Sequence, residues 1–171
     1  NALNKDETLG DEYQILDLLS KATRTVDVAL LSYSPLTHDD GRFYPALETA
    51  LRSAEARGVK VRLLVSHWME EKDEFDHLVS LDVLDGVEVR ACRIPPAESG
   101  EIPFARVHHS KYLVVDGEEG WLGTSNWGHG YFHESRNYGM VFCNGAIPKR
   151  LQELFDFDWP RSTSLVDHRK K

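Results

Sequence analysis

The sequence has little of what marks several large protein classes. No run of about 18 apolar residues could span a bilayer, and no charged segment followed by an apolar one opens the chain as a secretory signal would. We therefore expect no transmembrane segment. Only two cysteines are present, which excludes a disulfide-stapled scaffold. Cys92 and Cys143 could form one bridge or none, and both lie in apolar, strand-like runs where a buried free thiol is the commoner state.

Positive charge is also scarce. The chain has 20 Lys and Arg against 28 Asp and Glu, a formal net charge of −8, so we do not expect it to coat nucleic acid through bulk charge. Any phosphate site must be a local basic spot on an acidic protein. Neither the G-x-x-x-x-G-K loop nor the G-x-G-x-x-G loop of nucleotide-binding enzymes occurs, and we expect no cofactor.

The length and the apolar content indicate one domain. Of 171 residues, 41% are hydrophobic, enough for a single fold that removes roughly 70% of the unfolded chain's surface from water. No repeat or low-complexity linker marks a boundary, so we predict one domain over residues 1–160 and a polar tail over residues 161–171. The chain begins with Asn1 rather than Met, which leads us to expect a processed or excised piece. Its compartment cannot be read from its ends.

Apolar periodicity predicts an α/β fold. Long continuous apolar strands between helices are typical of parallel βαβ units, and they fill the first hundred residues. Shorter strand candidates separated by turns then indicate antiparallel or mixed pairing. The prediction is a mixed sheet flanked by helices on both faces. The expected helices are 11–22, 44–57, a third from the acidic run 70–76 to about 84, and 148–159; the expected strands are 26–31, 59–65, 87–94, 106–109, 112–115, 120–124 and 138–143.

One stretch carries recognisable chemistry. It has the form H-x-K-x4-D-x6-G-[ST]-x-N and begins at His109. Residues two apart in a strand share a face, so His109 and Lys111 project together, and a turn after Asp116 would bring Asn126 beside them. An ammonium and an amide can hold the oxygens of a phosphodiester while the imidazole exchanges protons or attacks phosphorus. His109 is preferred to His108 because only His109 stands two residues before Lys111.

This motif resembles the HKD signature of the phospholipase D superfamily. The match departs from the usual pattern at Thr124, where Ser is usual; threonine keeps the hydroxyl and adds a methyl group. Further stretches make nearly the whole chain similar to the C-terminal half of the branch that contains the lysosomal 5′ exonucleases called phospholipases D3 and D4. These stretches are residues 42–45, 58–64, 102–107, 123–127, 131–134 and 158–159.

The resemblance implies a mechanism, a fold and a partner. Two HKD motifs share one active site; one histidine forms a covalent phosphohistidine, and the other protonates the leaving oxygen. This chain has one motif, so a second is expected from an N-terminal half of the same protein or from a second copy across a twofold axis. The implied fold is the αβα sandwich of one phospholipase D half, and the implied compartment is lumenal, lysosomal or otherwise extracytoplasmic.

The remaining candidate residues have separate expected roles. Lys111 and Asn126 are catalytic candidates with His109. Glu134 follows Tyr131 and Phe132 as the family's orienting glutamate does and would fix the imidazole. The residues expected to touch substrate are Thr124, Ser125, Tyr33, His67 and Trp68, although the last three could equally pack loops.

Two motif residues are expected to serve the structure rather than the chemistry. Asp116 would fix a turn, because an acid beside a phosphate repels it. Gly123 would let the backbone approach closely.

Metal chemistry is not expected. The spacing His129-x3-His133-Glu134 could be scanned as a zinc site, but Gly128 and Gly130 argue against a helix there and the H-E-x-x-H order is absent. The acidic run at 70–76 is interpreted as a solvated helix face. Three functions stay open: a phosphodiesterase for single-stranded nucleic acid, a phospholipase, and a non-catalytic binding module.

Overall fold

A mixed β-sheet forms the centre of the molecule. The computed structural model describes residues 6–100 and 102–165. Seven strands lie in the order β8-β6-β5-β1-β3-β4-β9. β1, β3 and β4 are parallel, and the other neighbours pair antiparallel. The strands are β1 (Thr25–Leu30), β3 (Lys60–Ser66), β4 (Val87–Cys92), β5 (Lys111–Val115), β6 (Glu119–Gly123), β8 (Gly139–Cys143) and β9 (Thr163–Ser164).

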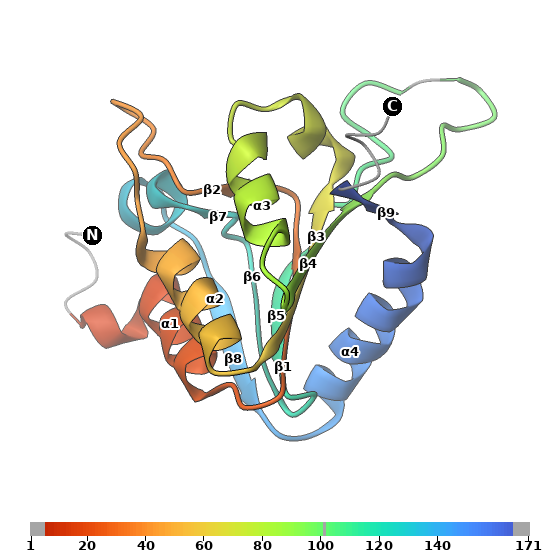
Figure 1. Cartoon of the computed structure of the whole chain (residues 1–171). Helices are drawn as coiled ribbons and strands as arrows, with labels where there is room; N and C mark the ends of the chain where they lie inside the picture. The colour runs from red at the N-terminus through yellow and green to blue at the C-terminus, as the bar shows by residue number, and fades with distance from the viewer. Residues whose placement is uncertain (1–5, 101, 166–171) are drawn as a thin grey trace.

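Helices cover both faces of this sheet (Figure 1). Three lie on one face, α1 (Asp11–Lys21), α2 (Ala46–Ala56) and α3 (Phe75–Asp82), and α4 (Ala146–Asp158) lies on the other. Alternation along β3 shows why: Val61 and Leu63 pack in the core under the first three helices, whereas Leu64 packs in the core under α4. The predicted α/β class, with a mixed sheet between two helical layers, is confirmed.

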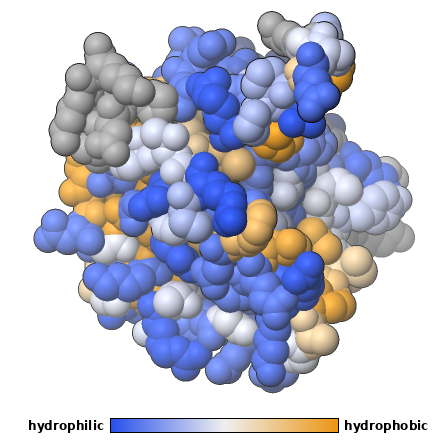
Figure 2. Space-filling view, turned by 90° about the vertical axis from the view of Figure 1, so that its right-hand side faces the viewer, coloured by the Kyte–Doolittle hydropathy of each residue, from blue (hydrophilic) through white to orange (hydrophobic). Residues whose placement is uncertain are grey.

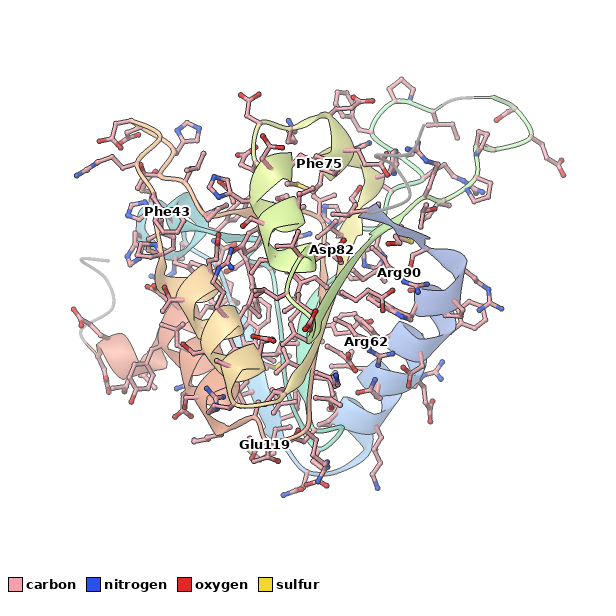
Figure 3. The ribbon with its side chains drawn as sticks, in the orientation of Figure 1. Phe43, Arg62, Phe75, Asp82, Arg90 and Glu119 are labelled. Carbon is pink, nitrogen blue, oxygen red and sulfur yellow. The ribbon has the colours of Figure 1, made fainter. Side chains whose placement is uncertain are left out.

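A buried ion pair joins the central strands to α4. The Asp27 carboxylate accepts hydrogen bonds from Nε and Nη2 of Arg62 at 2.6 and 2.7 Å, and from Gln152 of α4 at 2.6 Å. The Arg62 guanidinium lies over the Phe155 ring, 4.8 Å from its centroid. Figure 3 shows Arg62 and Arg90 between the sheet and α4. Because the Asp27 charge is paired and hydrogen-bonded, it is tolerated in the core.

Short elements complete the fold at the sheet ends. A second, two-stranded sheet pairs β2 (Tyr33–Ser34) with β7 (Trp127–Gly128) in parallel. These strands tie the segment after β1 to the segment after β6, which carries Asn126. The short helical turns are η1 (Glu7–Leu9), η2 (His67–Glu71), the π-type turn η3 (Gly130–Glu134) and η4 (Trp159–Arg161).

Two predicted elements are wrong. The acidic run does not open a long helix: Ser66 caps a 3₁₀ turn, η2, by accepting a hydrogen bond from the Trp68 amide at 3.2 Å, and α3 begins only at Phe75. Residues 106–109 form no strand; Val107 alone makes a bridge, to Arg93. The physical reason is that this segment has passed beyond the strand ends and finds no neighbouring edge there.

The chain end and one cysteine also differ from expectation. β9 pairs with β4, and Leu165 is buried in the core, so the fold extends past the predicted boundary at residue 160. The rest of the predicted tail, residues 166–171, lies outside the described residues. Cys92 is buried as predicted, but Cys143 is exposed because β8 is an edge strand; both thiols are free.

The surface on the α4 side is mainly hydrophilic, with hydrophobic residues in separate patches (Figure 2). Exposed apolar residues of α4 include Ile147, Leu154 and Phe157. None of the helices in the described ranges is both long and apolar enough to cross a bilayer.

Candidate active site

His109 and Lys111 lie where β5 begins. Because β5 runs antiparallel to β1, with Lys111 opposite Leu30, this point is also the carboxyl end of β1. Lys111 Nζ lies 3.2 Å from Nδ1 of His109 and donates a hydrogen bond to the His109 carbonyl at 3.0 Å. The Lys111 side chain is buried, with 7% exposure, and burial lowers the pKa of its ammonium. The result is a cation held beside an exposed imidazole.

Asn126 reaches the same sheet edge from the other half of the motif. It is 3% exposed, and its side-chain oxygen accepts a hydrogen bond at 3.3 Å from the amide of Ser32, which follows β1. That bond leaves the amide's NH₂ group to donate elsewhere. An imidazole, an ammonium and an amide donor therefore share one end of the sheet, as the spacing predicted.

Of two neighbouring histidines, the exposed one is His109. His108 is buried, and burial lowers the pKa of its imidazole. Its Nε2 has no hydrogen-bond partner within the described ranges. A substrate approaching from solvent can reach His109 but not His108.

The two polar residues just before Asn126 form hydrogen bonds within the protein. The Thr124 hydroxyl donates to the Asn137 side chain at 3.0 Å and accepts from the Tyr138 amide at 3.1 Å. Ser125 is fully buried and donates to Asp11 of α1 at 2.7 Å. A side chain at Gly123 would place its Cβ 2.4 Å from the Trp121 ring, so glycine is required there by packing rather than by the close ligand approach expected from the sequence.

Asp116 lies at the opposite end of β5 and has a structural role. Its carboxylate accepts hydrogen bonds from the amides of Arg24 and Thr25 at 2.7 and 2.8 Å, and from the amide and hydroxyl of Thr23 at 3.0 and 2.7 Å. Burial alone would raise the pKa of this carboxyl, but hydrogen bonds from Thr25, Thr23 and Arg24 outweigh it, and the pKa is lowered. Asp116 therefore anchors the start of β1 as well as its own turn.

Glu134 contacts a different histidine from the one the sequence predicted. Its Oε1 lies 3.0 Å from Nδ1 of His129. The cause is η3, which folds Glu134 back onto the residue five positions earlier; this helical turn forms despite the two glycines that argued against it. The His133 ring is tilted against that of His129, with centroids 4.6 Å apart, and its Nε2 lies 3.0 Å from Glu12.

The aromatic candidates occupy different surroundings. Tyr33 is fully buried, and burial raises the pKa of its phenol; it belongs to the core. His67 and Trp68 are half-buried and line a cavity of about 430 Å³ beyond the carboxyl end of β3. Of the two interpretations left open, packing fits Tyr33 and a surface groove fits His67 and Trp68.

Sequence reasoning did not find a large cavity at this end of the sheet. It measures about 800 Å³ and is bounded by the segments 32–41, 69–74 and 127–135, with Glu134 in its wall. The pairing of β2 with β7 brings the first and third of these segments together, and two-residue strands leave no periodic signal. Within the described part of the chain, no three His, Cys, Asp or Glu side chains group in a way that could hold a metal ion.

Comparisons with known proteins agree with this geometry. Residues 15–159 match the family model described as "Cardiolipin synthase, PLD-like domain". The chain is 35% identical to a probable phospholipase D of Caenorhabditis elegans over 161 residues, covering 85% of this chain and 29% of that protein. It is 33% identical to the mouse 5'-3' exonuclease PLD4 over 164 residues, covering 85% of this chain and 32% of that protein. The chain thus spans about a third of the length of these relatives.

Solved structures share the fold. NucT from Helicobacter pylori superposes with a TM-score of 0.72 at 18% identity, covering 89% of each chain. The phospholipase D family member Nuc from Salmonella typhimurium superposes with a TM-score of 0.65 at 16% identity, covering 88% of each chain. The extent of the family match, together with the HKD residues gathered at one sheet edge, shows that this chain belongs to the phospholipase D superfamily.

Proposed function

We propose that this chain is one half of a phosphodiesterase whose active site is built around His109. The observation that carries the proposal is the buried Lys111 ammonium 3.2 Å from the His109 ring, at the sheet edge that also holds Asn126. Lys111 and the Asn126 amide bind the non-bridging oxygens and stabilise the charge that develops on them. The exposed imidazole of His109 supplies the reacting nitrogen or the proton.

The proposed reaction proceeds in two steps. An imidazole nitrogen attacks phosphorus; the N–P bond forms while the P–O bond to the leaving group breaks, and a protonated second histidine gives its proton to the departing oxygen. The second histidine is then neutral. Water attacks the phosphohistidine and gives a proton to this second histidine. The P–N bond breaks, the phosphate is released, and both histidines return to their starting states.

This reaction needs a second HKD motif. The nucleophile must be neutral and the acid protonated, on opposite sides of phosphorus, so one imidazole does not serve both roles. We propose that the second motif belongs to an N-terminal half of the same protein, because this chain spans about a third of the length of the relatives it matches. A second copy of the chain is the alternative partner.

Single-stranded nucleic acid is the proposed substrate. The support is the similarity to 5'-3' exonucleases from mouse and other animals, together with a site made of small polar groups beside aromatic side chains. Because other relatives are named phospholipase D, a phospholipid is the alternative substrate. We propose Glu134 as a positioning residue for the reaction, Thr124 and Ser125 as shapers of the phosphate site, and metal-independent turnover.

One panel of substrates tests the proposal. The chain, assembled with the half that carries the second HKD motif, is incubated in the presence of EDTA with bis(p-nitrophenyl) phosphate, a single-stranded oligonucleotide and phosphatidylcholine vesicles. We expect cleavage of the first two and little release of choline. Release of choline without oligonucleotide cleavage would assign a phospholipase. No turnover of any substrate once the second motif is supplied would leave the binding module as the function.

A further inference from the structure

The connection between β4 and β5 forms an unusual surface loop. Its base is closed by the bridge between Arg93 and Val107, and its described residues between them belong to no strand. Because β4 lies beyond β3 in the sheet while β5 pairs with β1, this loop must cross the carboxyl ends of β3 and β1. It leads directly into His109. In Figure 1 it is the green segment that projects at the upper right.

The loop exposes a large aromatic side chain. Phe104 is 89% exposed, although burial of such a ring would stabilise a protein substantially. Its backbone has a φ of 59°, and Arg106 has a φ of 57°, in the left-handed region that residues other than glycine seldom occupy. Strained backbone of this kind is characteristic of functional sites. The loop therefore keeps the Phe104 ring in solvent, although the backbone conformation and the exposure of an apolar ring are both unfavourable.

Phe104 and Arg106 line the same cavity as Trp68. This cavity of about 430 Å³ is also lined by His67, Arg93 and the carboxylate residue Glu71. The His67 and Trp68 rings stand edge to face, with centroids 6.3 Å apart. The cavity therefore combines flat aromatic surfaces with two arginines and one carboxylate. It lies beyond the carboxyl end of β3, and part of its wall is the loop that leads into His109.

The two arginines differ in how far their charge is compensated. Arg93 donates to the Glu70 carboxylate at 2.5 Å. Arg106 donates through Nε to the Pro95 carbonyl at 2.8 Å, an acceptor without net charge. Arg106 thus keeps its positive charge for a ligand, whereas the charge of Arg93 is shared with Glu70.

We propose that this cavity, formed by Phe104, Trp68 and Arg106, is a stacking site for a base of single-stranded nucleic acid. The inference rests on the proposed function and adds the surface that selects the substrate. Aromatic rings accept any base on their faces, and an arginine at the rim pairs with the adjoining phosphate. The site holds the strand beside His109, so it contributes to substrate binding more than to the chemical step.

A titration of intrinsic fluorescence tests binding without catalysis. Trp121 and Trp127 are fully buried and Trp159 is nearly so, whereas Trp68 is half-buried. A base stacking on Trp68 quenches its emission. We expect a short oligothymidylate to quench the fluorescence of the purified chain saturably, and Trp68→Phe to abolish the quenching.

Matched variants locate the site. Phe104→Ala and Arg106→Gln are each expected to weaken oligothymidylate binding about tenfold. Phe157→Ala is the control, because Phe157 is also an exposed aromatic but lies on α4; its binding should not change. Thermal unfolding of each variant checks the fold. Binding that is unchanged in both loop variants would overturn the proposal.

Kinetic measurements on the complete enzyme, with both HKD motifs present, test this inference separately from the proposed function. Phe104→Ala should raise the KM for an oligonucleotide about tenfold and leave turnover of bis(p-nitrophenyl) phosphate unchanged, because that substrate has no adjoining base. Normal KM in Phe104→Ala overturns the stacking site and leaves the phosphodiesterase intact. A third outcome is that the protein hydrolyses nothing but binds oligothymidylate in a way that depends on Phe104. That result supports the stacking site and contradicts the proposed phosphodiesterase activity. An effect confined to phosphatidylcholine vesicles assigns the cavity to lipid and overturns the proposal.

Discussion

Glu134 Oε1 lies 3.0 Å from Nδ1 of His129, in the wall of the cavity of about 800 Å³ at the end of the sheet that carries the HKD residues. A carboxylate so held can orient an imidazole by fixing its tautomer. We propose His109 as the imidazole that matters in the assembled enzyme. Glu134→Gln should then lower kcat about tenfold with little change in KM and shift the pH profile of kcat.

The matched variant His129→Asn tests which ring Glu134 serves. It removes the observed contact and should change kcat less than about twofold if the contact only holds the carboxylate in place. Equal losses in the two variants would instead show that Glu134 acts through His129. The measurement is a steady-state pH profile with bis(p-nitrophenyl) phosphate.

His109 carries the strongest prediction about activity. His109→Asn should reduce kcat at least about 1000-fold, and Lys111→Gln should reduce kcat/KM by a similar factor because it removes the buried charge beside the imidazole. His77→Asn is the control, since His77 is a histidine of α3 whose contacts are with Glu48 and Phe43 rather than with the HKD residues. Full activity in His109→Asn would contradict the proposed site.

Residue spacing predicted that His109, Lys111 and Asn126 lie at one end of the sheet, because the motif is local. Lys111 begins β5, His109 lies two residues before it, and Asn126 follows β6, which pairs with β5 across a short turn. The contact of Glu134 with His129 depends on a five-residue π-type turn, and the exposure of Cys143 depends on β8 having one neighbour. Such features come from tertiary arrangement, which apolar periodicity does not encode.

The long loop between β4 and β5 could not be predicted from the sequence either. The sequence predicted a strand over residues 106–109, but the chain crosses the strand ends there, so it makes only the single bridge between Val107 and Arg93. The exposure of Phe104 follows from the same crossing. By contrast, the continuous apolar runs of β1, β3 and β4 predicted a buried parallel core because both sides of each strand are covered.

Asp116 predicts a pH dependence of stability. Its folded pKa lies below the usual value of about 3.9, so its stabilising contribution is complete above that value and is lost as the pH falls through the folded pKa. Asp116→Asn should cost about 2 kcal/mol near neutral pH, because charged hydrogen bonds to Thr23, Arg24 and Thr25 are weakened. The variant's stability should vary less with pH in the acid range.

Urea unfolding at several pH values measures this effect. Asp39→Asn is the control, because Asp39 is highly exposed. The free energy of unfolding of this variant should differ from that of the unsubstituted protein by less than about 0.5 kcal/mol. A pH profile of Asp116→Asn identical to that of the unsubstituted protein would contradict the anchoring role.

Chelation tests how charge is stabilised in the reaction. Lys111, Asn126 and the paired histidines can together stabilise the charge that a divalent ion supplies in other phosphodiesterases. Activity toward bis(p-nitrophenyl) phosphate should therefore persist in excess EDTA. Loss of activity that is restored by Mg²⁺ or Zn²⁺, but not by washing out the chelator, would show that a metal takes part.

The last prediction concerns assembly. Because one imidazole cannot be both nucleophile and acid, the chain as a strict monomer should have no more than trace activity, and addition of the half that carries the second HKD motif should restore turnover. Analytical ultracentrifugation establishes the state of the sample in each assay. Full turnover from a proven monomer would overturn the two-motif mechanism.

A mixing experiment then separates the two possible partners. Equal amounts of the unsubstituted chain and His109→Asn are combined under exchange conditions. If each site uses two copies of this chain, random pairing leaves about a quarter of the activity, since both histidines must be intact. If the second motif comes from another half, activity follows the intact chains and about half remains. We expect the second result, because the relatives are about three times as long as the matched segment and can contain both motifs in one polypeptide.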